Sequence, residues 1–135
     1  MMVFSCALSG NFMVVINRML NVQMPRGDIR LIHFVVYDPS GEPSDVQFSQ
    51  IYFSVKNTVY EREVLFQKSL TAGGIIRLDD GSYQIKIDPE DTEDLHMNTR
   101  YVFDIELIYE DEIRQTEFGE LFLTNEVTCS WNEAI

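Results

Sequence analysis

The chain has 135 residues, a length that fits a single domain, and its 45% hydrophobic and 24% charged residues are typical of a globular fold. Twenty-two acidic side chains against ten basic ones give a formal net charge of −12. This charge argues against binding to nucleic acid or to an anionic membrane surface, because both are recognised by clustered Lys and Arg.

The N-terminal segment differs in composition from the rest of the chain. Residues 1–24 hold five of the six methionines. Residues 1–30 carry three basic and one acidic side chain, whereas the rest of the chain carries seven basic and twenty-one acidic ones. The segment lacks the positively charged start of a secretory signal, and no apolar run approaches the roughly 20 residues of a membrane span. We therefore expect no signal peptide and no contact with a membrane.

Methionine adapts to irregular apolar contacts, so a Met-rich segment suits the edge of a core or a surface for a partner. We expect residues 1–24 to form an N-terminal arm or edge strand in which Met13, Met19 and Met24 make interactions. The apolar pattern within residues 12–24 fits both a helix and a strand. The many Val and Ile residues favour the strand.

After Gly27, segments in which apolar and polar residues alternate end at turn-forming residues, the pattern of antiparallel strands. The predicted strands are 29–38, 50–56, 63–70, 75–78, 82–88, 101–109 and 113–124. Gly119 interrupts the last of them and predicts a bulge. The acidic segment near residues 89–96 begins with a proline and is predicted to form one short helical turn.

These elements predict an all-β fold, an immunoglobulin-like antiparallel β-sandwich of about seven to nine strands over residues 25–128. Residues 129–135 would form a C-terminal tail. Leu95 precedes Tyr101 by six residues at the entry to the longest strand. This spacing is similar to the tyrosine corner of such sandwiches, in which the phenol hydroxyl bonds to backbone a few residues upstream.

The sequence offers no set of residues with the spacing of a catalytic or metal site. His33 lies in the middle of a predicted strand, where a half-buried structural histidine is the simplest interpretation, and His96 is expected in solvent. Asp79, Asp80 and the acidic run 88–94 offer oxygen ligands for calcium, but they lack the EF-hand pattern and are predicted to be solvated loops. We expect no enzyme activity, no catalytic residues, no cofactor and no metal.

Two further features leave alternatives open. Cys6 and Cys129 lie near opposite ends of the chain, and nothing in the sequence decides whether they pair. A carbohydrate-binding module would need exposed aromatic side chains with polar neighbours. Candidates are Tyr37, Tyr52, Tyr60 and Trp131.

Several short segments, in their order and spacing over residues 24–128, resemble small structural domains of phages and prophages. The N-terminal domain of baseplate upper proteins is the best-known type. The matching segments are 24–28, 38–43, 53–56, 74–76, 80–83, 87–92, 101–106, 119–124 and 127–128. The family is not catalytic, so the resemblance carries over no active-site residues.

The resemblance implies a structural or assembly protein of a phage or prophage tail or baseplate, made in the bacterial host cytoplasm. Its expected partners are copies of itself and other virion proteins, because symmetric oligomers are the default in such particles. Two alternatives stay open. One is a β-sandwich module that binds carbohydrate or another host surface, and the other is a capsid decoration or head-tail connector protein.

Overall fold

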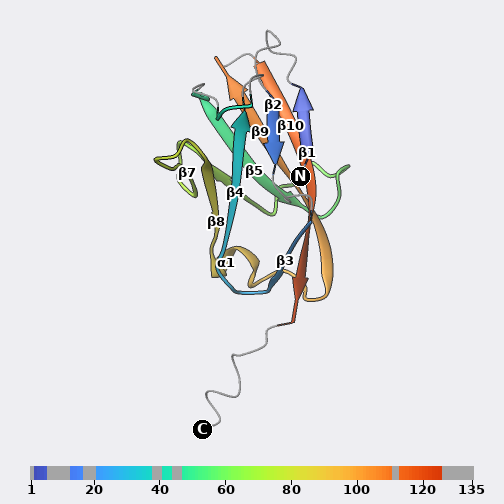
Figure 1. Cartoon of the computed structure of the whole chain (residues 1–135). Coiled ribbons are helices and arrows are strands. Elements are labelled where there is room, and N and C mark those ends of the chain that lie inside the picture. The colour runs from blue at the N-terminus through green and yellow to red at the C-terminus, as the bar shows by residue number, and fades with distance from the viewer. Residues whose placement is uncertain are drawn as a thin grey trace.

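Two β-sheets face each other in the computed structural model of the chain (Figure 1). The structure describes residues 2–5, 13–16, 21–37, 41–43, 47–110 and 113–125. The first sheet has the order β1 (Met2–Ser5), β2 (Met13–Ile16), β4 (Arg30–Tyr37), β8 (Tyr83–Ile87) and β7 (Ile75–Arg77). The second has the order β3 (Asn21–Pro25), β10 (Ile113–Thr124), β9 (Thr99–Tyr109), β5 (Gln50–Lys56) and β6 (Phe66–Ser69). The predicted all-β sandwich is confirmed.

The segment before residue 25 contributes strands to both sheets. β1 pairs with β2, and β2 pairs with β4 in the first sheet. β3 belongs to the second sheet, where it runs parallel to the last five residues of β10. The prediction of strand rather than helix is thus confirmed over β2 and β3. Val22 and Met24, at 6% and 2% exposure, point from β3 into the core.

The core lies between the sheets and is built by every second residue of the strands, as the pleat of a strand requires. Ile51, Phe53 and Val55 of β5 are completely buried. Phe53 packs against Phe103 of β9, with ring centroids 5.2 Å apart. Each fully buried large apolar side chain contributes about 2 kcal/mol to folding, so this layer holds the sheets together.

Strands β9 and β10 form the longest pairing, and its register runs without interruption from Ile113 opposite Tyr109 to Leu123 opposite Thr99. Gly119 lies directly opposite Phe103 within it. The bulge predicted at Gly119 is therefore wrong. A bulge needs an extra residue on one strand, and the two strands here match residue for residue.

A short helix, α1 (Pro89–Thr92), follows β8 and confirms the predicted helical turn. Its start is fixed by Asp91, whose Oδ2 accepts a hydrogen bond of 2.7 Å from the backbone N–H of Asp88. Lys68 of β6 reaches α1 and places its Nζ 2.9 Å from Asp88 Oδ2 and 2.7 Å from Asp91 Oδ2. This contact fastens the second sheet to the helix that follows the first.

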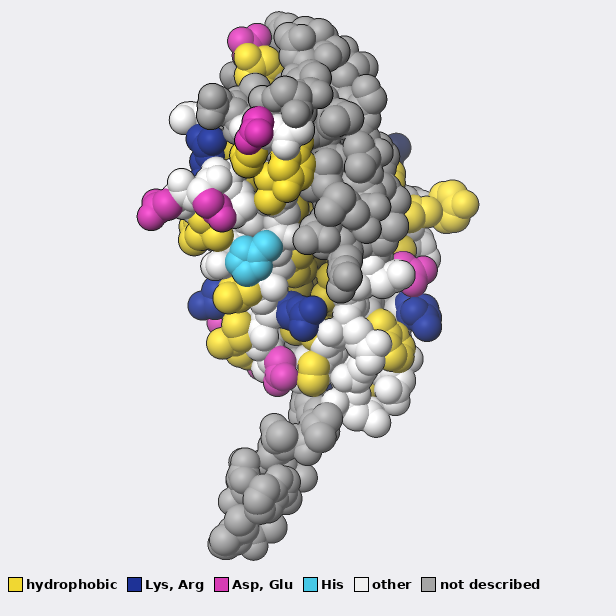
Figure 2. Space-filling model, in the orientation of Figure 1, with side chains coloured by type: hydrophobic (Ala, Val, Ile, Leu, Met, Phe, Trp, Pro, Cys, Tyr) yellow, Lys and Arg dark blue, Asp and Glu magenta, His cyan; other side chains and the backbone are white. Residues whose placement is uncertain are grey.

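The face of the molecule turned to the viewer in Figure 1 carries β4, β8 and β7, and Figure 2 draws the same view as a space-filling model. Hydrophobic side chains are scattered over this face among charged and neutral polar ones. Among the apolar residues of these strands, Leu31 of β4 and Ile76 of β7 are 46% and 50% exposed. The outer surface of the first sheet is therefore partly apolar.

Candidate functional site

The tyrosine predicted to brace the entry to β9 lies in the core with 2% exposure. The hydroxyl of Tyr101 accepts a hydrogen bond of 2.8 Å from the backbone N–H of His96, five residues upstream. Leu95, the other residue of the predicted corner, is half-buried against the core, and its carbonyl accepts a hydrogen bond of 3.2 Å from Arg26 Nη1. These bonds fix the loop between α1 and β9, a structural role.

The three methionines of the predicted interaction arm have different positions. Met24 is a core residue of β3, so its side chain does not stand on the surface. It pairs across the sheet edge with Leu123 of β10, which is completely buried. Met13 lies in β2, and Met19 lies outside the described residues, as do Cys6, Cys129 and Trp131.

In the part of the chain that the structure describes, neither histidine lies in a cluster of side chains that could hold a metal ion. His33 is exposed rather than half-buried, because it points outward from β4, and its Nε2 lies 3.0 Å from Oε1 of Gln84. His96 is exposed in the loop after α1. Among the described residues, no group of three or more His, Cys, Asp or Glu is placed to hold a metal ion. Asp80 accepts bonds from Ser82 within its own turn.

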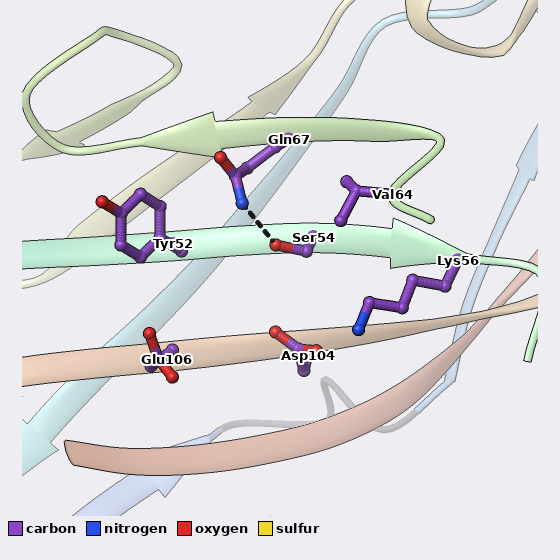
Figure 3. Close-up of a pocket in the computed structure, with 7 residues that line it drawn as sticks. All are labelled: Tyr52, Ser54, Lys56, Val64, Gln67, Asp104 and Glu106. Carbon is purple, nitrogen blue, oxygen red and sulfur yellow. Dashed lines mark hydrogen bonds between the residues drawn. The ribbon is translucent and has the colours of Figure 1, made fainter. Parts of the chain in front are cut away.

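A polar depression of about 270 Å³ lies on the outer face of the second sheet (Figure 3). Side chains of three neighbouring strands and of the loop before β6 line it: Tyr52, Ser54, Lys56, Val64, Gln67, Asp104 and Glu106. The register explains the gathering, since Tyr52 is opposite Glu106 and Ser54 is opposite Asp104. Outward-facing neighbours on adjacent strands meet on one face.

The polar groups in this depression support one another. Gln67 Nε2 donates a hydrogen bond of 2.9 Å to the hydroxyl of Ser54, which is 5% exposed. The side chain of Lys56 runs toward Asp104 in Figure 3. Burial raises the pKa of Asp104, Lys56 lowers it, and Glu106 raises it, and the net result lies above the ordinary value. With Asp104 and Glu106 against Lys56, the depression carries more carboxylates than cations.

An apolar depression of about 540 Å³ lies beside it on the same face, nearer to β10 and β3. Its lining residues are Asn21, Val59, Val102, Phe118, Gly119 and Glu120. Val59 and Phe118 are 51% and 53% exposed. β9 links the two depressions, because Val102 lines the apolar one and Asp104, two residues further on, lines the polar one.

This surface suits binding more than reaction. It combines apolar side chains with three carboxylates, an ammonium group, hydroxyls and two amides, and both depressions are open. The outward direction of Asp104 and Glu106 is predictable from the alternation of β9. Their meeting with Tyr52, Ser54 and Gln67 is not, because it depends on which strands become neighbours.

No protein-family model matches the sequence, and no curated protein matches it either. In the part of the chain that the structure describes, no helix has the length and apolar character to cross a membrane.

Proposed function

We propose that this chain is a non-catalytic structural protein of a phage or prophage particle, a component of its tail or baseplate that acts through protein–protein contacts. It is synthesised in the cytoplasm of the bacterial host and joins copies of itself and other virion proteins. The proposal rests on the resemblance of its sequence segments and on the character of its surface.

The strand order supports an immunoglobulin-like type for the sandwich. In such folds four strands in the order ABED face a sheet built from G, F and C, to which variable-type domains add C′. The neighbours β2, β4, β8 and β7 correspond to the first set, and β10, β9, β5 and β6 to the second. The backbone bond of Tyr101, at the start of the strand equivalent to F, fits the same assignment.

The observation that carries the proposal is the exposure of apolar side chains on the outer faces of both sheets. On the first sheet they are Leu31 and Ile76, with Ile29 just before β4, each about half exposed, and on the second they are Phe118 and, in the loop after β5, Val59. An acidic protein gains solubility from a polar surface, so apolar side chains exposed on both faces indicate contact with other proteins.

Mass spectrometry of purified particles tests the proposal. Particles would be banded from a culture of the bacterium that carries the gene, after prophage induction. We expect the chain in the particle band at an amount comparable to known tail proteins. Its restriction to the unassembled fraction of the lysate would contradict a structural role.

A second candidate function, binding of a neutral carbohydrate, is favoured by the polar depression. Tyr52 borders a set of carboxylate, hydroxyl and amide groups there, the combination that carbohydrate ligands use. A glycan array distinguishes the candidates: specific signals that are lost in Tyr52→Ala and Asp104→Asn would support it, and an array without signals would remove it.

A further inference from the structure

We propose that the apolar depression beside β10 binds the C-terminal segment of the same chain, residues 126–135, with the ring of Trp131 seated in it. This contact lies within one chain and does not depend on the proposed function. It covers Val59 and Phe118, whose side chains are otherwise half exposed to water. A partner protein that uses this surface then has to displace the segment first.

The depression suits an aromatic side chain that also carries a hydrogen-bond donor. Val59, Val102 and Phe118 supply its apolar lining. Asn21 and Glu120 also line it, and their side chains carry oxygen atoms that accept hydrogen bonds. An indole ring has an apolar body and a single N–H, so it is best buried where such an acceptor is near. The volume of about 540 Å³ has room for the ring.

The position where the C-terminal segment leaves the fold is fixed by hydrogen bonds. Asn125 directly follows β10, and its Oδ1 accepts a hydrogen bond of 3.0 Å from Asn98 Nδ2. The backbone N–H of Asn98 donates a hydrogen bond of 2.6 Å to the carbonyl of Leu123. Residues 126–135 lie outside the described residues and therefore start beside the loop that leads into β9.

The segment is long enough to return to the depression. Along β10, Glu120 lies five residues before Asn125, which corresponds to about 17 Å of strand. Trp131 lies six residues after Asn125, and six extended residues span about 20 Å. A turn after Asn125, a residue type common in turns, thus brings Trp131 to the level of Glu120. Val102 and Asn21 are the neighbours of Glu120 across the strands at that level.

The outer face of the first sheet is a poorer site for the same ring. Its half-exposed apolar side chains, Leu31 of β4 and Ile76 of β7, are separated by β8. Lys86 and Gln84 of β8 stand opposite them. A ring on that face would cover polar groups, whereas in the apolar depression it contacts three apolar side chains.

Trp131 is the only tryptophan of the chain, so its fluorescence tests the contact in the full-length protein. We expect the folded protein to emit at shorter wavelength than the protein unfolded in urea, with severalfold weaker quenching by acrylamide. Phe118→Ala should shift the emission toward that of the unfolded protein and restore the quenching. Leu31→Ala is the matched control, because Leu31 is similarly exposed on the other sheet, and it should leave the emission unchanged.

A double-mutant cycle measures the same contact without fluorescence. Trp131→Ala and Phe118→Ala should each lower the free energy of unfolding, measured by urea denaturation and circular dichroism. The double variant should lose less than the sum of the two, because both substitutions remove one contact. Trp131→Ala combined with Leu31→Ala should give additive losses. Additive losses for Trp131→Ala with Phe118→Ala would overturn the inference.

Three fluorescence results would also overturn the inference. If the folded and unfolded proteins emit alike, Trp131 lies in water. If the emission is shifted but does not respond to Phe118→Ala, the ring lies elsewhere on the protein. If the shift grows with protein concentration, the ring binds another copy and not its own chain. None of these results affects the particle analysis, which tests the proposed function separately.

Discussion

Glu117 faces the interior of the sandwich from β10. It lies on the same side of the strand as Leu121 and Leu123, both completely buried, and opposite Ile105 of β9. Its Oε1 accepts a hydrogen bond of 3.2 Å from the backbone N–H of Phe118, and its buried Oε2 accepts none from any described residue. Burial raises the pKa of this carboxyl, and the single backbone bond only partly offsets the effect.

Replacing Glu117 with Gln should stabilise the protein at neutral pH. The variant removes a buried negative charge whose solvation is incomplete, so the free energy of unfolding should rise by about 1 kcal/mol. Urea denaturation at pH 7 measures the change. Glu120→Gln is the matched control, because Glu120 is exposed on the opposite face of the same strand and forms a surface ion pair with Arg100. If Glu117→Gln lowers the free energy of unfolding while Glu120→Gln leaves it unchanged, the prediction is wrong, and the surroundings of Glu117 stabilise its negative charge.

At the scale of single elements, Lys68 joins β6 to the start of α1. Its side chain is 13% exposed and packs against Gly74, where a Cβ atom would lie 2.6 Å from Lys68 Cδ. Burial lowers the pKa of Lys68, but hydrogen bonds and charge interactions with Asp91 and Asp88 outweigh it and raise the pKa above the ordinary value. The bonded form of the lysine is therefore the charged one.

Lys68→Met should lower the free energy of unfolding by about 2 kcal/mol, because two carboxylates beside α1 lose their common partner. Lys86→Met provides the comparison, since Lys86 meets the same Asp88 from an exposed position at 3.6 Å and should cost less than about 0.5 kcal/mol. Chemical denaturation of both variants measures the two losses in the free energy of unfolding. Equal effects would mean that partial burial adds nothing to the Lys68 contact.

The loop between α1 and β9 depends on the hydroxyl of Tyr101. Tyr101→Phe leaves the backbone N–H of His96 without this acceptor and should cost about 1 to 2 kcal/mol. Tyr83→Phe is a suitable control, because Tyr83 has the same 2% exposure and its hydroxyl bonds to no other described residue. Thermal unfolding should separate the two variants. Similar melting temperatures would show that the hydroxyl bond does not fix the loop.

At the scale of the whole molecule, alternation along the chain is sufficient to predict the sandwich. The pattern in β5 and β9 puts Phe53 and Phe103 inward and Asp104 outward, as observed, because a strand has a period of two. The sites depend on contacts that no local pattern contains. Lys68 meets Asp88 from twenty residues away, and the polar depression exists because β5 lies between β6 and β9.

Whole-molecule stability is expected to reach its maximum at mildly acidic pH. The pKa values of Glu117 and Asp104 lie above their ordinary values of 4.5 and 3.8, each through burial, so the folded state binds more protons than the unfolded state just above those values. The free energy of unfolding therefore increases as pH falls from neutrality through the raised pKa values. Protonation also reduces the repulsion within a protein of net charge −12.

Further acidification should reverse the trend. The hydrogen bond from Lys68 holds the pKa of Asp88 below 3.8, and the bonds from Ser82 do the same for Asp80. The stability that these carboxylates contribute is present above pH 3.8 and is lost as pH falls through their lowered pKa values. Urea denaturation over a series of pH values should therefore give a maximum between neutrality and pH 3.8, lower in height for Lys68→Met. A continuous decline of stability from pH 7 downward would contradict the burial of Glu117 and Asp104 as charged groups.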